Sequence, residues 1–274
     1  MTAAPAGRSR VGGAAGFAAR YGPWALVAGA SEGLGAAFAR QLAERGLNLI
    51  LVARRSEPLA ELAGRLPTRA EPVAADLGTA DGLRRVTEAA RGREVGLVVA
   101  NAAYAPIGRF ADLDPEQTRR AVDLNCRAPL ELAHHFLPPM LARRRGGLII
   151  MSSLAGLQGA PPISVYAATK AFGTILAEGL WAELRGTGVD VLACVAGAVA
   201  TPNLAGAKGR PAPGTRTPDQ VAAAALRGLG HGPRVVPGLG MRLSAAVLSR
   251  LLPRRAAISV MARASADVTG PGPG

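Results

Sequence analysis

Six short apolar runs recur along this chain, each followed by a segment of helical periodicity, and this alternation restricts the fold more than any other feature. The first two runs, WALVA and LNLILVA, are almost free of polar residues, as strands buried on both faces of a sheet are. Parallel strands need a crossover, usually a helix, which is right-handed. We therefore predict an α/β fold, a doubly wound parallel sheet with helices on both faces. The strands are placed at residues 24–28, 47–53, 71–76, 95–101, 146–153 and 189–197.

Composition is consistent with one domain. With 274 residues and 49% hydrophobic content, the chain can bury a large core, and no linker or repeat divides it. Helices are expected at 36–46, 58–66, 81–92 and 115–135, and another is expected to begin after Pro161 and Pro162. We assign residues 1–20 to a flexible N-terminal extension, 21–240 to the α/β domain and 241–274 to a basic, amphipathic C-terminal extension.

Charge and cysteine usage narrow the class of protein. Cys126 and Cys194 lie in apolar segments without metal-ligand spacing, which indicates buried thiols in a reducing compartment and no metal site. No apolar run has the length of a membrane span, and residues 1–20 lack the apolar core of a secretory signal, so we expect a cytoplasmic protein. The net charge of +13 is spread along a chain with only 4% aromatic residues, and nucleic acid is therefore not expected as a partner.

A glycine-rich turn, GASEGLG, follows the first predicted strand and opens a helix. Glycines at this place let the backbone approach a dinucleotide pyrophosphate, and the helix start supplies free N–H groups and a positive dipole end. The spacing is G-x-x-x-G-x-G, without the lysine of a P-loop, and by itself such a turn is as often only structural. Between a buried strand and a helix it favours a cofactor site made by Gly29, Ser31, Gly33, Leu34 and Gly35.

The end of the second predicted strand indicates which dinucleotide is bound. An acidic residue that would read a ribose hydroxyl is missing there, and Ala53, Arg54 and Arg55 stand in its place. A guanidinium pairs well with the oxygens of a 2′-phosphate, so Arg54 favours NADP (NADPH) as the cofactor. The alternative, that both arginines are solvated charges at a strand end, applies more to Arg55 than to Arg54.

The stretch MSSLAGLQGAPPISVYAATK contains Ser153, Tyr166 and Lys170. Four residues along a helix is a net rotation of roughly 40°, so Tyr166 and Lys170 share one face. An ammonium beside a phenol is expected to lower the phenol pKa, and a serine hydroxyl can bond the same substrate oxygen. The group would exchange a proton with a carbonyl or an alcohol while a hydride moves. The alternative is that Y-x-x-x-K is a common pattern on exposed helices.

These motifs together resemble the short-chain dehydrogenase/reductase family. The signatures AGASEGLG, ADL and NAA, followed by Asn125 and the Ser153, Tyr166 and Lys170 set, occur in the family's order over much of the chain. The resemblance implies a single Rossmann-type domain in which Tyr166 is the general acid/base, Ser153 orients the carbonyl, and Lys170 lowers the phenol pKa and holds the nicotinamide ribose. Ser152 is a second candidate for the serine, and the interval to Tyr166 selects Ser153.

The same resemblance assigns the remaining cofactor positions. Asn125 would hold a water that links Lys170 to solvent. Asp76 and Leu77 would line the adenine, Asn101 would lie near the adenine-side ribose, and Val199 and Thr201 would contact the nicotinamide amide. The chain departs from the family pattern at Ala28, Ala103 and Ala196, which replace a threonine, a glycine and a proline. The loss of the proline makes the nicotinamide end the least secure part of this assignment.

Substrate and assembly are only broadly indicated. The lead-in RYGPWALVAGAS and the chain's ending are similar to bacterial members related to hydroxysteroid and long-chain 3-ketoacyl reductases, which favours a largely apolar small-molecule ketone or secondary alcohol. We expect residues 203–218 and the tail to form the outer wall of the pocket, and a homodimer or homotetramer. Packing of the tail on the body or on a neighbouring subunit is favoured over contact with a membrane. A dinucleotide-binding sensor without redox turnover is the alternative function.

Overall fold

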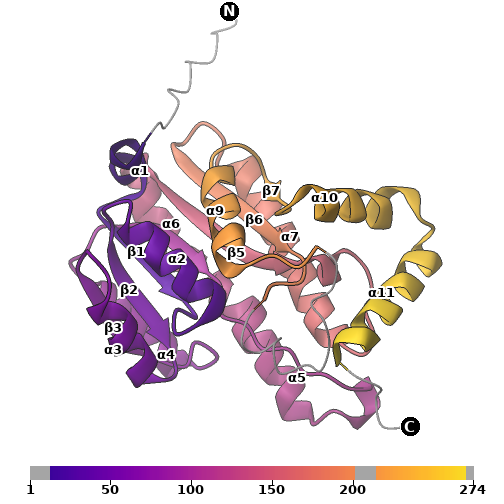
Figure 1. Cartoon of the computed structure of the whole chain (residues 1–274). Helices are drawn as coiled ribbons and strands as arrows, with labels where there is room; N and C mark the ends of the chain where they lie inside the picture. The colour runs from indigo at the N-terminus through magenta and orange to yellow at the C-terminus, as the bar shows by residue number, and fades with distance from the viewer. Residues whose placement is uncertain (1–12, 201–213, 270–274) are drawn as a thin grey trace, which may run out of the picture.

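The computed structural model describes residues 13–200 and 214–269, which form a twisted, wholly parallel sheet between two layers of helices (Figure 1). The strand order is β3-β2-β1-β4-β5-β6-β7. The strands are β1 (Trp24–Ala28), β2 (Asn48–Ala53), β3 (Ala70–Ala74), β4 (Val95–Ala100), β5 (Gly146–Ser153), β6 (Val189–Ala196) and β7 (Arg234–Val235). The predicted doubly wound fold is therefore confirmed.

Side-chain alternation along each strand creates two apolar layers. Leu26 and Ile50 point into one layer, which helices α4, α6 and α7 cover, while Val27 and Leu51 point into the other, covered by α1, α2, α3 and α9. Both layers are closed to water, since all four of these strand residues are fully buried. This explains why the strands read as unbroken apolar runs in the sequence.

The helices occupy the intervals between the strands. They are α1 (Ala14–Tyr21), α2 (Gly33–Ala43), α3 (Ser56–Gly64), α4 (Ala80–Ala90), α5 (Pro115–Val122), α6 (Ala128–Ala142), α7 (Ser164–Glu183), α9 (Pro218–Gly228), α10 (Leu239–Ala246) and α11 (Arg254–Thr269). Short turns of other helix types are η1 (Phe110–Asp112), η2 (Asp123–Arg127), η3 (Leu154–Leu157) and η4 (Val247–Leu251). Among the described residues, no helix is long and apolar enough to cross a bilayer.

The N-terminal segment differs from its prediction. Residues 1–12 lie outside the described residues, but the rest of the expected flexible extension forms α1. Phe17 and Tyr21 are buried against the sheet. The Tyr21 hydroxyl donates to Asp190 Oδ2 on β6 at 2.7 Å, and Arg20 pairs with the same carboxylate at 2.5 Å. The prediction of flexibility over residues 13–20 is wrong because it did not recognise these partners, which are distant in sequence.

The C-terminal segment forms a helical arm, α10–η4–α11, that lies beside α7 at the right of Figure 1. Its inner side packs on the body through Met241, Ala245 and Ala257. The amphipathic pattern of this segment predicts that one half of a helical wheel is apolar, comprising Met241, Leu243, Val247, Leu248, Leu251 and Leu252. Met241 packs on the body, but two of the leucines do not. Leu243 and Leu251 are 68% and 74% exposed. The π-type turn η4 changes the helical phase between them.

Candidate active site

The neighbours of β1 in the sheet are β2 and β4, so the chain reverses its direction of winding between β1 and β4. Ligands of doubly wound sheets bind at such a switch point, beyond the carboxyl ends of the strands. Gly29 directly follows β1 and Asn101 directly follows β4, while Ser153 ends β5. The predicted glycine loop and the predicted proton-transfer group therefore lie on the same edge of the sheet.

Close packing explains the glycines of the loop. Gly29 and Gly33 have φ angles of +75° and +55°, a region that disfavours side chains. A Cβ at Gly35 would lie 1.9 Å from the carbonyl oxygen of Gly29, so α2 can start there only without one. The Asn101 side chain donates to the carbonyls of Ala28 and Gly29 at 3.2 and 3.1 Å and holds the loop in place.

The start of α2 fits an anionic group. Glu32 occupies the N-cap position, and its side chain makes no capping bond to the helix. The first N–H groups therefore have no side-chain acceptor from the cap residue, as a pyrophosphate site requires. Glu32 would repel a phosphate, but its carboxylate pairs with Arg55 at 3.0 Å. Ser31 and Leu34 lie in the same turn and are partly buried.

Arg54 and Arg55 have different surroundings. Arg55 is engaged by Glu32, whereas no ion pair is found for the exposed Arg54 within the part of the chain that the structure describes. Arg54 nevertheless lies close enough to Asp76 to stabilise the charge of that carboxylate. Arg54 is therefore the arginine whose guanidinium is available, and it is also the one for which the sequence predicted a phosphate-binding role.

Asp76 is bonded on both oxygens. Its Oδ1 accepts from the Gly78 N–H at 3.0 Å and its Oδ2 accepts from Arg120 at 2.8 Å. Burial opposes ionisation of Asp76, but these bonds outweigh it, and the pKa lies below its ordinary value. Leu77 next to it packs into the core and is only 3% exposed. The motif thus ties β3 to α5 through Arg120, a residue that the sequence analysis did not single out.

The two adjacent serines have separate roles. Ser152 is buried, and its hydroxyl lies 2.8 Å from the Lys170 carbonyl and 2.6 Å from Thr174 Oγ1. Ser153 lies at the strand end, where its Oγ accepts from Ala155 N at 3.2 Å and hydrogen-bonds the Tyr166 phenol. Geometry therefore agrees with the choice of Ser153 over Ser152 as the partner of the tyrosine.

Lys170 is buried, with an exposed fraction of 6%. Its Nζ donates to the Met151 carbonyl at 2.8 Å and lies 5.5 Å from the centre of the Tyr166 ring. Burial lowers the pKa of Lys170 to about 8, although the nearby Cys126 opposes this shift. An ammonium has three N–H donors, and a buried one with a single bonded carbonyl is well placed to bind a further hydroxyl group.

The pKa of Tyr166 moves opposite to the prediction. Burial raises it, the hydrogen bond with Ser153 lowers it, and burial is the larger effect. The ammonium of Lys170, 5.5 Å from the ring centre, does not reverse this shift. The net shift is therefore upward, opposite to the expected lowering of the phenol pKa. A raised pKa makes the phenol a weaker acid, so burial by itself opposes proton donation by Tyr166.

Asn125 lies in η2, a π-type turn between α5 and α6. Its Oδ1 accepts from Tyr104 N at 2.8 Å, and its Nδ2 donates to the Tyr104 carbonyl at 2.8 Å and to Thr169 Oγ1 at 2.9 Å. Both amide hydrogens are therefore used, so a water bound to this residue would have to donate to one of its oxygens. Thr169 escaped the sequence analysis, although it stands between Tyr166 and Lys170.

The far side of the site is built by segments after β6. Val199 forms a parallel bridge with Arg216, and the bonds Ala200 N to Arg216 O (2.9 Å) and Arg216 N to Ala198 O (3.0 Å) close the base of the intervening loop. Thr201 and most of the predicted 203–218 loop lie outside the described residues.

The C-terminal arm reaches this same side. Met241 packs against Gly197, where an added Cβ would come within 2.7 Å of its sulfur. Met261 and Tyr166 both pack against a small cluster that includes Ala155 and Ala167. The arm therefore contributes apolar surface to the same cluster as the tyrosine, an arrangement that no local sequence pattern could reveal.

Fold and site together define a dinucleotide-dependent oxidoreductase that acts on hydroxyl and carbonyl groups. The family model for short chain dehydrogenases matches residues 23–210, and the chain belongs to this family. The identification rests on most of the sheet and on the whole motif series, from Gly29 to Lys170.

Known proteins support the same family. A 7beta-hydroxysteroid dehydrogenase of Clostridium sardiniense is 34% identical over 68% of this chain and 73% of its own length. A very-long-chain 3-oxoacyl-CoA reductase-like protein of Arabidopsis thaliana is 32% identical over 80% of this chain and 73% of its own. A solved 7beta-hydroxysteroid dehydrogenase structure superposes with a TM-score of 0.85 at 29% identity, covering 89% of this chain and 98% of that one. A Sphingobium yanoikuyae short-chain dehydrogenase in complex with NADPH gives 0.74 at 31% identity, covering 83% and 93%.

Proposed function

We propose that the protein is an NADPH-dependent carbonyl reductase acting on bulky, largely apolar ketones, with Tyr166 as proton donor. The observation that carries this proposal is the arrangement of Tyr166 and Lys170 on one face of α7, with the Lys170 Nζ 5.5 Å from the centre of the phenol ring and Ser153 at the adjoining end of β5. A phenol and a serine hydroxyl at this place can supply the proton that the carbonyl oxygen must gain in reduction.

Each residue of the proposed catalytic set has a part in this reaction. NADPH, when bound, supplies the hydride. Ser153 and Tyr166 both donate hydrogen bonds to the substrate carbonyl oxygen, which polarises it and fixes its position. Tyr166 then gives up its proton as negative charge develops on that oxygen. Lys170 holds a ribose hydroxyl and stabilises the tyrosinate, and a water held by an oxygen of Asn125 leads a proton back from solvent.

NADPH is proposed on the basis of Arg54. Its guanidinium is exposed beside the end of β2, while Arg55 is neutralised by Glu32. The glycines of the loop leave the room that a pyrophosphate needs, and the uncapped start of α2 supplies N–H donors. A relative solved with NADPH supports the same choice. Asp76, Leu77, Asn101, Val199 and Thr201 complete the proposed cofactor site.

The apolar substrate is proposed from the wall opposite the glycine loop. Met241 of the C-terminal arm lies next to Gly197, Met261 packs against the same cluster as Tyr166, and a flexible thioether fits irregular apolar ligands. Relatives named as acting on hydroxysteroids and very-long-chain 3-oxoacyl-CoA have substrates of this kind.

A homo-oligomer is proposed from a different surface. Val122 on α5 and Phe172 and Ile175 on α7 are 50%, 38% and 67% exposed. These helices pack against each other, so the three side chains extend an apolar face that a second copy could bury.

The test of the function is Tyr166→Phe. The variant keeps the ring and its packing but has no proton to give, so turnover of a bulky ketone should fall by about 10²–10⁴-fold. NADPH binding, measured by the fluorescence of the reduced nicotinamide, should change little. Ser152→Ala is the matched control, because this hydroxyl contacts α7 and not the phenol. Full turnover in the Phe variant would exclude Tyr166 as the donor. Binding of NADPH with no turnover of any carbonyl by the unmodified protein would favour the non-redox alternative.

A further inference from the structure

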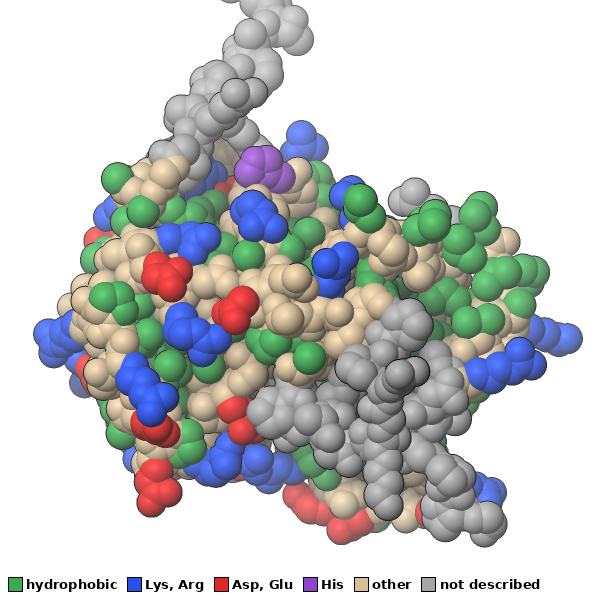
Figure 2. All heavy atoms as spheres, in the orientation of Figure 1, with side chains coloured by type: hydrophobic (Ala, Val, Ile, Leu, Met, Phe, Trp, Pro, Cys, Tyr) green, Lys and Arg blue, Asp and Glu red, His purple; other side chains and the backbone are tan. Residues whose placement is uncertain are grey.

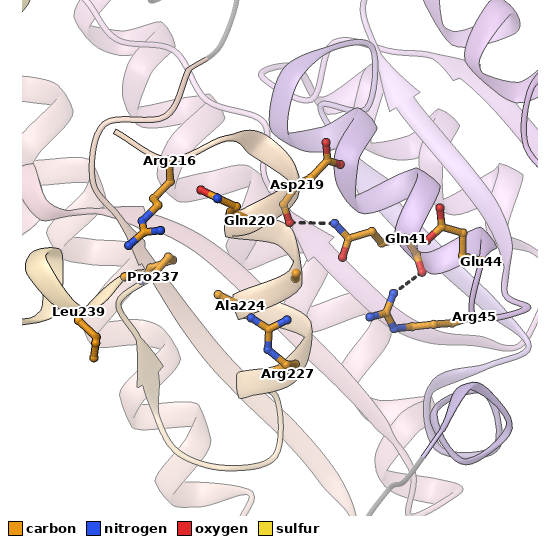
Figure 3. A pocket seen from close by; sticks show the side chains of 12 residues that line it. Gln41, Glu44, Arg45, Arg216, Asp219, Gln220, Ala224, Arg227, Pro237 and Leu239 are labelled. Atoms are coloured by element: carbon orange, nitrogen blue, oxygen red, sulfur yellow. Dashed lines mark hydrogen bonds between the residues drawn. The ribbon is translucent and has the colours of Figure 1, made fainter. Parts of the chain in front are cut away.

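An open groove lies on the outer side of α2 and α9 (Figure 3), and one of its residues, Arg216, forms the bridge with Val199. Its volume is about 730 Å³, and its floor and walls come from the end of α2, from α9 and from the segment that leads into α10. None of the proposed catalytic or cofactor residues lines it. The groove is therefore a second concave surface that the proposed reaction does not use.

Three arginines from separate segments line this groove. Arg45 ends the α2 side, Arg216 precedes α9, and Arg227 lies near the end of α9 (Figure 3). Burial lowers the pKa of Arg45, and the positive charge of Arg227 lowers it further, against the opposing effect of Glu44. Arg45 and Arg227 are thus close enough to repel each other, and bound negative charge would relieve that repulsion.

Carboxylates in the groove offset these arginines only in part, because three arginines face two carboxylates. The groove is lined by Glu44 and Asp219, and Asp219 already pairs with Arg40 at 3.1 Å. No ion pair is found for Arg216 or Arg227 within residues 13–200 and 214–269. The sequence between these ranges, 201–213, contains no acidic residue that could supply one. The groove therefore carries net positive charge.

Exposed leucines continue from the groove along the C-terminal arm. Leu239 lines the groove and is 78% exposed, and Leu243 lies one helical turn later on the same face of α10, 68% exposed. Leu251 at the end of η4 is 74% exposed. Figure 2 shows hydrophobic side chains gathered over this arm, with basic side chains at its edge. From residue 220 to residue 266 the sequence has seven arginines and no acid.

We propose that the groove and the outer face of α10 form a docking surface for an anionic lipid bilayer. Headgroup phosphates bind at Arg45 and Arg227, and Leu239, Leu243 and Leu251 enter the acyl region. Apolar side chains flanked by arginines are the pattern of helices that lie in the membrane interface. A second copy that met this surface face to face would bring the same arginines against each other, so it is the less suitable occupant here, and the homo-oligomer proposed above uses α5 and α7 instead. This inference rests on surface residues and does not depend on the proposed reaction.

Vesicle co-sedimentation of the full chain tests the proposal. Vesicles of phosphatidylcholine alone are compared with vesicles containing one third phosphatidylglycerol, at low and high salt. We expect at least tenfold stronger partitioning to the anionic vesicles, and most of this preference should be lost at high salt, since screening weakens exposed charges. Leu239→Gln with Leu243→Gln should reduce partitioning by roughly tenfold or more. Arg227→Gln should reduce it for anionic vesicles only.

Matched controls and competing occupants are part of the same experiment. Phe110→Gln changes an exposed apolar residue on η1, and Arg85→Gln an exposed arginine on α4, and neither should alter vesicle binding. The proposal is overturned if the vesicles do not differ or if the leucine variants bind like the unmodified chain. Loss of a dimer in the leucine variants, with vesicle binding unchanged, would assign the face to a second copy. Glycerol phosphate binding at the groove without vesicle binding would assign it to a free phosphate ligand.

Discussion

Replacing Lys170 by methionine should stabilise the protein while it removes activity. The side chain is 6% exposed, and burial lowers its pKa from 10.5 to about 8. At 1.36 kcal/mol for each pKa unit, the buried ammonium costs about 3 kcal/mol at neutral pH. Methionine gives up the bond to the Met151 carbonyl, a loss of about 1–1.5 kcal/mol. The variant should therefore be more stable by about 1–2 kcal/mol at pH 7.

The pH dependence of this gain provides a sharper test. Below pH 8 the lysine is protonated in both the folded and the unfolded chain, so the full penalty applies to the unmodified protein. Between pH 8 and 10.5 the folded chain loses the proton first, and the stability of the unmodified protein rises with pH. The advantage of Lys170→Met should shrink over this window and change sign near its middle, at about pH 9.

Denaturant unfolding of both proteins at pH 7 and pH 10 measures the difference directly. Titrating groups that do not interact with Lys170 affect both proteins equally and cancel in the comparison, whereas Cys126, whose pKa is raised by burial and lowered by Lys170, does not. Arg185 is an exposed arginine in the turn that follows α7, the helix of Lys170. Arg185→Met should therefore show neither the gain in stability nor its pH dependence. A variant that is less stable at pH 7, or a difference that does not change with pH, would refute the reasoning that Lys170 is a destabilising buried charge.

Three further changes test the remaining assignments. Ala53→Asp with Arg54→Gln should shift preference from NADPH toward NADH, by roughly ten- to a hundredfold in the ratio of their binding constants, whereas equal binding of both cofactors by the native chain would make Arg54 only a surface charge. Truncation after residue 240, or the milder Met261→Ala, should impair turnover of long apolar ketones more than of short ones. An equal loss on long and short ketones would mean that the C-terminal arm does not recognise the substrate. Gly35→Ala should abolish cofactor binding seen by nicotinamide fluorescence, because its Cβ would lie 1.9 Å from the Gly29 carbonyl oxygen, and normal binding would contradict the packing.

The sheet could be predicted because a strand that is buried on both faces is an unbroken apolar run, and such a run can be recognised in each strand separately. LNLILVA needs no knowledge of its neighbours to indicate β2, and the glycine turn before α2 is equally local. The short strand β7 and helix α1 carry no such signal. Arg234 and Val235 form a strand only because β6 offers a free edge, and α1 is held by Asp190, which lies far away in the sequence.

The sequence could place the site residues relative to one another, but it could not give the electrostatics of the site. The interval between Ser153 and Tyr166 selected Ser153 over Ser152, and the structure places Ser153 at the end of β5 and Tyr166 on α7, since strand end and helix face are both set by local pattern. The roles of these residues stay a proposal. The sign of the Tyr166 pKa shift depends instead on burial of the phenol, and the tyrosine packs against a cluster that includes Ala155 and Ala160 from outside its own helix. Burial of this kind is a property of the assembled fold.

The bridge between Val199 and Arg216 joins the two ends of the connection between β6 and α9, so changes within that connection need not disturb the fold. Because this bridge fixes both ends of the connection, the chain between them can change in sequence and length while β6 and α9 keep their positions. Doubling the length of such a connection costs only about 0.6 kcal/mol in closure entropy. If this connection walls the pocket, as we propose from the sequence of residues 203–218, substrate range can diverge by exchange of one segment, and a chimaera that carries a relative's connection should inherit its selectivity with little loss of thermal stability.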